Sequence, residues 1–323
     1  MKPAILIARE VFEEVIADLE RDFAVESNQA DVLFTPDQLV EKLQGKQGVL
    51  TTVMDKIDDG MMARCPDLKV ISNIAVGYNN IDVAAATARG IKVTNTPEVL
   101  NEATADLTWA ILMAAARRVA EGDAFVRRGE WRKAFAMKRW LGADLHGATL
   151  GIIGMGRIGQ AIARRALGFD MRVLYHNRAR LDAATEAALR CEYSQDRDGV
   201  LKEADFLVVM VPYSAATHHF IKAGDIAKMK PSAILVNTAR GGVVDDAALI
   251  AALKAGTIAG AALDVFEGEP KLNSEYSQLK NVVLTPHIGS ATRSTRMAML
   301  RLAAKNLTAA LKGEAPPNWV NKT

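Results

Sequence analysis

The sequence predicts an α/β protein with two doubly wound units, each built on a parallel sheet. Short runs rich in β-branched residues alternate with helical stretches along almost the whole chain. This alternation falls into two series, which are separated by a long apolar helical segment at residues 101–131. The length of 323 residues also exceeds the size at which a single core usually keeps growing.

The larger series starts at residue 148 and contains six strand candidates. They are TLGIIG, RVLYH, ADFLVVMV, AILVNT, AGAALDV and NVVLTP. Helical segments such as DDAALIAALKAG separate them, and Gly256 is the expected C-cap of that segment. Repeated strand–helix–strand units place helices on both faces of a sheet, so we expect a six-stranded parallel sheet.

The smaller series occupies the first hundred residues, with strand candidates in PAILIA, FAVES, QGVLTT, LKVISNIA and IKVTNT. Asn101 is the expected N-cap of one long connecting helix. A C-terminal amphipathic helix, RSTRMAMLRLAAKNLTAALKG, follows the sixth strand of the larger unit and is expected to return to the smaller one. The predicted domains are therefore 1–98 with 290–323, and 99–289.

Composition excludes several classes of protein. Forty basic and thirty-eight acidic residues leave a formal charge of +2, and no dense basic block argues for nucleic acid as a partner. The apolar start is too short for a signal peptide and no run is long enough to span a membrane, so we expect a cytoplasmic protein. Cys65 and Cys191 lie far apart, and their spacing predicts neither a disulfide nor a metal site.

A glycine-rich turn, GIIGMGRIGQAIARR, places Gly154, Gly156 and Gly159 in GxGxxG spacing between a strand and a helix. Glycines at these positions allow a tight turn, close approach to a pyrophosphate and helix–strand packing. The alternative is a tight turn without a ligand, in which two of the three positions could carry side chains at little cost. We favour a dinucleotide site.

The next strand indicates which dinucleotide binds. RVLYHNRAR ends in His176, Asn177 and Arg178, where an acidic residue would normally bind the ribose 2′-hydroxyl. Arg178 could pair with a 2′-phosphate, with Arg180 as a helper, so we expect NADPH to be preferred over NADH. The alternative is that both arginines form a solvated surface.

Polar residues recur where the six strands of the larger unit end. The carboxyl ends of parallel strands share one edge of a sheet, which is where ligands bind. His287 can transfer a proton near neutral pH, and Glu269 would favour its protonated form. Arg240 presents a planar donor fork for a carboxylate or keto oxygen. Together they indicate hydride transfer from a nicotinamide to a 2-keto carbon. Each residue alone has another interpretation: His287 could cap backbone groups, Arg240 could form an ion pair with Asp245 or Asp246, and Glu269 could be solvated in its loop. The residues at the six ends are Gly154, His176, Pro212, Arg240, Asp264 and His287.

With VNTARGGVVDDAALIAAL, AALDVFEGEP and TPHIGSAT in this order, the chain resembles the D-isomer-specific 2-hydroxyacid dehydrogenase family over nearly its whole length. Within that family it is most similar to glyoxylate/hydroxypyruvate reductases, including the bacterial type that also reduces 2-ketogluconate. The resemblance implies two Rossmann- or flavodoxin-like domains, with Arg240, Glu269 and His287 as catalytic residues. It also implies a homodimer in which the segment at 100–147 crosses to the partner.

The resemblance further implies a set of binding residues. The backbone amides of Val76 and Gly77, in AVGYNNID, would hold the substrate carboxylate, and Ser290 would lie near the substrate. Trp140 would reach the partner's substrate pocket or pack in the interface. Asp264 could be purely structural. The implied cofactor contacts are Thr104, Arg157, Ile158, Pro212, Thr217, Thr238, Ala239 and Asp264.

Two other functions remain open at this stage. A D-lactate or 3-phosphoglycerate dehydrogenase would share the fold, and an NADH preference would favour it. A nicotinamide-sensing scaffold, similar to transcriptional corepressors of this fold, would bind protein instead. His218 and His219 are expected to be surface groups in a polar connection.

Overall fold

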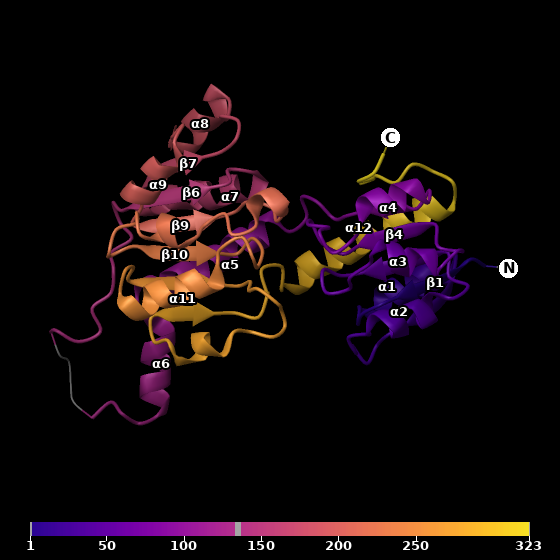
Figure 1. Cartoon of the computed structure of the whole chain (residues 1–323), viewed down its shortest axis with the longest axis horizontal. Helices are drawn as coiled ribbons and strands as arrows, with labels where there is room; N and C mark the ends of the chain where they lie inside the picture. The colour runs from indigo at the N-terminus through magenta and orange to yellow at the C-terminus, as the bar shows by residue number, and fades with distance from the viewer. Residues whose placement is uncertain (1, 133–136, 323) are drawn as a thin grey trace. The chain divides into compact units, whose positions relative to one another are not determined.

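The computed structural model describes residues 2–132 and 137–322. The chain forms two compact units, Met1–Leu100 with Ala291–Thr323 and Asn101–Ser290. Each unit has its own parallel sheet and its own helices (Figure 1). The predicted α/β class with two doubly wound sheets is therefore confirmed.

The first unit is a five-stranded sheet in the order β2-β1-β3-β4-β5 within the described residues. Apolar residues alternate between its two faces, since Leu6 and Val49 belong to one cluster, whereas Ile5, Ile7 and Leu50 belong to another. Every strand pairing is parallel, and each predicted segment forms a strand. The strands are β1 (Ala4–Ile7), β2 (Ala24–Ser27), β3 (Gly48–Thr51), β4 (Val70–Asn73) and β5 (Lys92–Thr94).

Helices cover both faces of this first sheet. The C-terminal helix α12 (Arg293–Leu311) places Met297, Leu300 and Leu307 in the same apolar cluster as Ile5 and Ile7. The end of the chain therefore completes the core of the unit that the beginning of the chain forms. The other helices of this unit are α1 (Glu13–Glu20), α2 (Pro36–Leu43), α3 (Asp59–Ala63) and α4 (Val83–Ala88).

The second unit contains seven described strands, not the six that the sequence predicted, in the order β12-β11-β10-β9-β6-β7-β8. The additional strand is β8 (Cys191–Tyr193), which pairs only with β7 at the sheet edge. Three residues with an exposed, ion-paired Glu192 in the middle carry too little apolar pattern to be recognised. The other strands are β6 (Thr149–Ile153), β7 (Arg172–His176), β9 (Phe206–Val209), β10 (Ile234–Asn237), β11 (Gly260–Leu263) and β12 (Val282–Leu284).

Successive residues of the second sheet also enter opposite apolar clusters. Ile152 and Val208 face one cluster, which contains Ile162 of a helix, and Ile153 faces the other with Val200. The predicted helices on both faces are thus present. They are α7 (Arg157–Ala166), α8 (Ala183–Leu189), α9 (Arg197–Glu203), α10 (Ala223–Ile226) and α11 (Asp246–Ala255), with short 3-10 turns η1 (Leu167–Phe169), η2 (Ala215–Thr217) and η3 (Ser274–Gln278). Gly256 ends α11 with a φ of 69° and donates its N–H to Ala252, which confirms the predicted C-cap.

The long connecting segment is two helices rather than one. Helix α5 (Asn101–Ala116) starts at Asn101 itself, so Asn101 is a helical residue and not the predicted N-cap. Arg118 has a left-handed backbone with φ 54° and precedes α6 (Val119–Arg127), where its guanidinium pairs with Glu121 at 2.9 Å. The apolar pattern continues across this break, so the pattern did not reveal the change of direction. Among the described helices, not one is both long and apolar enough to cross a bilayer.

Candidate active site

The candidate site lies at the carboxyl edge of the second sheet. All its strands run parallel, so the residues that follow them emerge on the same edge. Each of the six predicted strands ends at or shortly before the end of its predicted segment. Gly154 follows β6, His176 ends β7, Asp264 follows β11, and His287 lies three residues after β12.

The imidazole of His287 is hydrogen bonded to the carboxylate of Glu269. Nδ1 of His287 lies 2.7 Å from Oε2 of Glu269, and both side chains are mostly shielded from solvent, with 30% and 19% exposure. The other carboxylate oxygen of Glu269 accepts the backbone N–H of Phe266 at 2.7 Å. Glu269 is thus held by its own loop and orients the ring, so that Nδ1 carries a proton toward the carboxylate and Nε2 remains available for a ligand.

Asp264 holds the turn that carries His287. Its buried carboxylate accepts the hydroxyl of Thr285 at 2.6 Å and the amides of Ile288 and Gly289, each at 2.8 Å. Burial raises the pKa of Asp264, while the Thr285 hydroxyl acts in the opposite direction. His287 itself has φ 52°, a backbone conformation that L residues rarely adopt and that surrounding structure must enforce. The contacts of Asp264 fit the structural alternative for this residue; a cofactor contact stays a prediction.

Arg240 is held in the adjacent loop with an unused donor. Its Nη1 donates to its own neighbour, the carbonyl of Ala239, at 2.8 Å, and its buried Nε has no hydrogen-bond partner among the described residues. Burial lowers the pKa of the guanidinium, which Glu269 opposes. A buried donor without an acceptor is costly in a folded protein and is typical of a site that awaits one.

The structural alternative for Arg240 was an ion pair with Asp245 or Asp246. Asp245 instead caps α11 by accepting the N–H of Ala248 at 3.0 Å. Asp246 accepts the hydroxyl of Tyr276 at 3.0 Å. Gly241 explains how the loop stays close to Glu269, because a Cβ there would lie 1.7 Å from the carbonyl oxygen of Phe266.

The three glycines of the β6–α7 turn differ in what requires them. At Gly154, which has φ 102°, a Cβ would lie 2.6 Å from the backbone of Met210, and at Gly159 it would lie 2.5 Å from the carbonyl oxygen of Gly154. A Cβ on Gly156 would meet nothing within 4 Å. Packing alone therefore requires two of the glycines, so the expectation that two of the three could carry side chains in a turn without a ligand was wrong. Only Gly156 is left without a structural reason, and a close ligand supplies one.

The tip of β7 presents Arg178 but not Arg180. Arg178 is exposed after the strand, whereas Arg180 makes a two-pronged pair with Glu186 at 2.9 and 2.7 Å. Glu186 also accepts the hydroxyl of buried Tyr175 at 2.6 Å. Nδ1 of His176 lies 3.1 Å from the carbonyl of Ser194, which fixes that ring at the strand end. Arg180 is therefore committed to the protein, and the predicted helper role is not supported by its contacts.

Several other predicted cofactor residues already serve the fold. Thr217 donates its hydroxyl to the carbonyl of Pro212 at 2.7 Å and closes the η2 turn. Thr238 lies buried with its hydroxyl 2.7 Å from that of Thr108 on α5. Ala239 is buried after β10, Thr104 is buried on α5, and Arg157 and Ile158 form the first turn of α7. Their contacts with a cofactor remain predictions.

In the first unit, the predicted substrate loop follows β4. Side-chain amides hold its carbonyls, since Asn95 donates to Val76 at 2.8 Å and Asn73 donates to Gly77 at 2.8 Å. Within the described residues, the amides of Val76 and Gly77 meet no acceptor. Two free N–H groups on a loop whose carbonyls are tied back form a suitable site for an anion. The sequence-based prediction did not identify either asparagine, although both lie within strand candidates.

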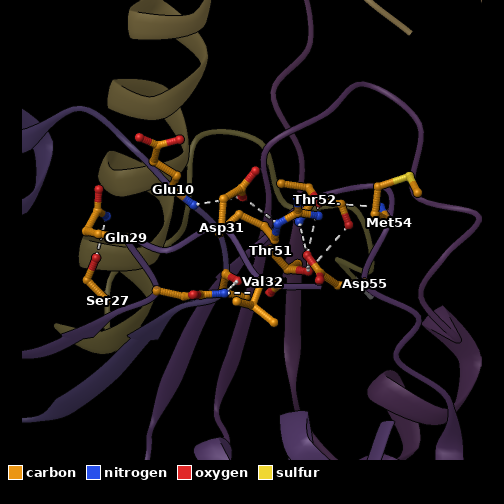
Figure 2. A network of polar contacts seen from close by, with 12 residues as sticks. Glu10, Ser27, Gln29, Asp31, Val32, Thr51, Thr52, Met54 and Asp55 are labelled. Carbon is orange, nitrogen blue, oxygen red and sulfur yellow. Dashed lines mark hydrogen bonds and ion pairs between the residues drawn. The ribbon is translucent and has the colours of Figure 1, made fainter. Parts of the chain in front are cut away.

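A second polar network of the first unit was also missed. Figure 2 shows Thr51, Thr52 and Asp55 together at the end of β3, where one oxygen of Asp55 accepts the Thr52 amide at 2.8 Å and the hydroxyls of both threonines at 3.0 Å. Nearby in the same view, Asp31 accepts the amide of Glu10 at 3.2 Å. Polar residues directly after strands were the available signal, as in the second unit.

Trp140 contacts residues of its own chain. Its ring centroid lies 5.0 Å from that of Phe125, and the guanidinium of Arg118 lies 5.0 Å above it. Ser290 is the last residue of the second unit and is half-buried. Neither observation tests the predicted roles of Trp140 or Ser290.

Comparisons with known proteins identify the family of the chain. Residues 109–289 match the family model described as D-isomer specific 2-hydroxyacid dehydrogenase, NAD binding domain. A glyoxylate reductase of Thermococcus litoralis is 50% identical over 100% of this chain and 98% of its own. A glyoxylate reductase of Pyrococcus furiosus is 51% identical over 100% of this chain and 96% of its own.

Solved structures show the same fold. A protein of Thermus thermophilus has a TM-score of 0.91 and 45% identity, covering 98% of this chain and 99% of that one. An NADPH-dependent glyoxylate/hydroxypyruvate reductase of Sinorhizobium meliloti, solved with NADP and malonate, has a TM-score of 0.86 and 35% identity, covering 99% of this chain and 97% of that one.

Proposed function

Because the chain belongs to the D-isomer-specific 2-hydroxyacid dehydrogenase family, we propose that it reduces small 2-keto acids to D-2-hydroxy acids with a reduced nicotinamide dinucleotide. Glyoxylate and hydroxypyruvate are the proposed substrates, and 2-ketogluconate is a further candidate. The observation that carries the proposal is the 2.7 Å contact between His287 and Glu269 at the edge where the βα turn with Gly156 also lies. The names of the relatives support the choice of glyoxylate.

A reduced nicotinamide dinucleotide held at the β6–α7 turn would supply the hydride for the carbonyl carbon of the keto acid. Nε2 of His287 donates a proton to the oxygen that becomes the hydroxyl, and Glu269 stabilises the imidazolium before that transfer. Arg240 directs its unused Nε–H, with the rest of its fork, at the carboxylate and keto oxygen. In the reverse direction the neutral imidazole takes the proton back.

A carboxylate-binding role is also proposed for the loop in the first unit. The free backbone amides of Val76 and Gly77 would donate hydrogen bonds to the substrate carboxylate. They are neutral donors, so they add no charge to the site.

The proposed cofactor is NADPH, with NADH used less well. Gly156 would face the pyrophosphate at the start of α7, and exposed Arg178 would pair with the 2′-phosphate. No acidic residue occupies the positions from His176 to Arg180 that end this strand. A 2′-phosphate would therefore meet a positive group and no repulsion.

The proposed assembly is a homodimer through the region around α6. Large apolar side chains are exposed in this part of the chain, including Val119 at 56%, Trp131 at 67% and Leu141 at 68%. Such a concentration of apolar surface is typical of an interface rather than of a free monomer surface. Sedimentation of the purified protein at several concentrations would test it, and a monomer at all concentrations would contradict it.

The proposed activity is tested by steady-state rates on glyoxylate, hydroxypyruvate, 2-ketogluconate, pyruvate and 3-phosphohydroxypyruvate with NADPH and with NADH. We expect the highest kcat/KM for glyoxylate or hydroxypyruvate with NADPH. A preference for pyruvate or for the phosphorylated acid with NADH would indicate the lactate or phosphoglycerate alternative. Tight cofactor binding without turnover of any of these acids would favour the scaffold alternative and overturn the proposal.

A further inference from the structure

Three metal-binding side chains converge outside the groups that the proposed reaction uses. One ligand atom each of His218, His219 and Glu267 lies within 4.8 Å of the others. His218 and His219 follow the η2 turn, and Glu267 follows β11, so the group joins two loops of the second unit. We propose that these three side chains bind a divalent zinc ion. The proposal does not depend on the proposed reductase activity.

The contacts of His219 give it the correct orientation for a metal. Its Nε2 is directed at Oε1 of Glu267, and its Nδ1 lies 3.7 Å from Oδ2 of Asp245. A zinc-bound imidazole usually presents its second nitrogen to a carboxylate, which fixes the tautomer and the ring plane. A small shift would bring Asp245 from 3.7 Å into hydrogen-bond distance and make it the outer carboxylate that such ligands use.

His218 supplies the second imidazole. Its ring stacks on that of His219, with centroids 3.9 Å apart and planes 24° apart. Its Nδ1 lies 3.2 Å from the hydroxyl of Tyr213. When Nδ1–H donates to that oxygen, Nε2 keeps its lone pair.

The backbone holds both histidines in place. Ser214 and Thr217 close the preceding turn through reciprocal contacts, and the N–H of His219 donates to the carbonyl of Gly242 at 2.7 Å. His219 has φ 49°, a left-handed conformation that this bond helps to maintain. The ligands thus sit on a preformed turn rather than on a loose surface loop.

Geometry and donor types favour zinc. Two imidazoles and one carboxylate are a common zinc set with an open fourth position for water. Ligand atoms on one tetrahedral zinc ion lie roughly 3.4 Å apart. The present spread of up to 4.8 Å requires a small side-chain rotation, which exposed His218 can make.

Bound zinc would brace the loop that also carries Glu269. Glu267 and Glu269 are separated by one residue, and the N–H of Glu267 is held by Asp246 at 3.1 Å. Linking Glu267 to the turn at 218–219 adds a second anchor to this loop. We therefore expect zinc to raise the midpoint of thermal unfolding by a few degrees, as any ligand specific for the folded state does.

The test is calorimetric titration of the full-length apo protein with ZnCl₂, together with Co²⁺ absorption as a report on four-coordinate geometry. We expect one zinc per chain and at least about tenfold weaker binding in His218→Ala and in Glu267→Gln. His146→Ala is the matched control, because His146 is exposed with its Nδ1 3.7 Å from Oδ2 of Asp170. His287→Ala separates the cluster from the His287–Glu269 pair. Both control variants should bind like the unchanged protein.

Two results would overturn the proposal. One is equal zinc binding by the unchanged protein and His218→Ala, whose exposed side chain can be removed without disturbing the core. The other is loss of binding in His287→Ala, which would locate the metal at the other histidine. Loss of the zinc-dependent thermal shift in His218→Ala, with its retention in His287→Ala, would support the cluster.

Discussion

The two units share one architecture but present different chemistry at equivalent places. Both are parallel sheets with helices on both faces, and in both the first strand, β1 or β6, lies inside the sheet between neighbours. After β6 the chain turns through Gly154 and Gly156, whereas after β1 it continues through Ala8 and Arg9. A sheet edge therefore provides a location for a ligand, but the residues in the first turn decide whether a phosphate can approach the backbone.

Each unit also uses one buried aspartate to hold a turn after a strand. Asp55 binds the turn after β3, and Asp264 binds the turn after β12. They differ in the residues that they hold. Asp264 holds a turn with an ionisable ring, His287, while Asp55 holds two threonines. The same local solution can thus support a proton-transfer site or a neutral polar surface, and this contrast leads to the following predictions.

The largest effect is expected from His287→Ala, which removes the ionisable ring that distinguishes the second unit. We expect kcat/KM for glyoxylate to fall by about 10²–10⁴, because the alkoxide loses its proton donor. Cofactor affinity should stay within a few fold. Steady-state kinetics and fluorescence titration of the dinucleotide measure the two quantities, and full activity in the variant would exclude His287 as the acid.

The glycine turn gives the next largest effect, through a matched pair of variants. Gly154→Ala should lower the midpoint of unfolding by several degrees, because it combines φ 102° with a Cβ 2.6 Å from the backbone of Met210. Gly156→Ala should leave that midpoint nearly unchanged and weaken dinucleotide binding at least about tenfold.

Thermal unfolding and cofactor titration separate the two glycine variants. Normal cofactor binding in Gly156→Ala would contradict the prediction. The added Cβ would then occupy the space that we assign to the pyrophosphate without weakening cofactor binding.

Arg240→Lys is expected to lower kcat/KM for 2-keto acids about tenfold or more, mainly through a higher KM. A lysine ammonium lacks the two-pronged donor geometry of the guanidinium. Arg89→Lys is the control, since Arg89 pairs with Asp59 on the surface of the first unit. Unchanged kinetics in Arg240→Lys would show that the unused Nε–H does not bind substrate.

The smallest effect concerns cofactor choice. Arg178→Ala should raise the dissociation constant for NADPH about tenfold, because one charge-assisted contact to the 2′-phosphate is lost, and leave that for NADH unchanged. Arg180→Ala is the comparison, since Arg180 pairs with Glu186. Equal losses for both dinucleotides in Arg178→Ala would place this arginine outside the specificity site.

Prediction from the sequence succeeded where one local pattern determines the outcome. The strand ends, the GxGxxG turn and the C-cap at Gly256 follow from short-range periodicity and from glycine's backbone freedom. It failed for β8, whose three residues carry little pattern, and for the break at Arg118, where the apolar pattern does not change. His218 is exposed, as predicted, whereas His219 is half-buried and contacts Glu267 from a distant loop, which the sequence did not reveal.

The sequence by itself determined the parallel architecture and the order in which His287, Glu269 and Arg240 follow their strands, because periodicity and turn chemistry act over a few residues. Only the tertiary structure decided the partners of those residues. The orphan donor of Arg240 and the meeting of His219 with Glu267 depend on loops that the packed core brings together. No short-range pattern in the sequence marks these contacts, because the number of residues between the two partners is set by the fold and not by the repeat of a helix or a strand.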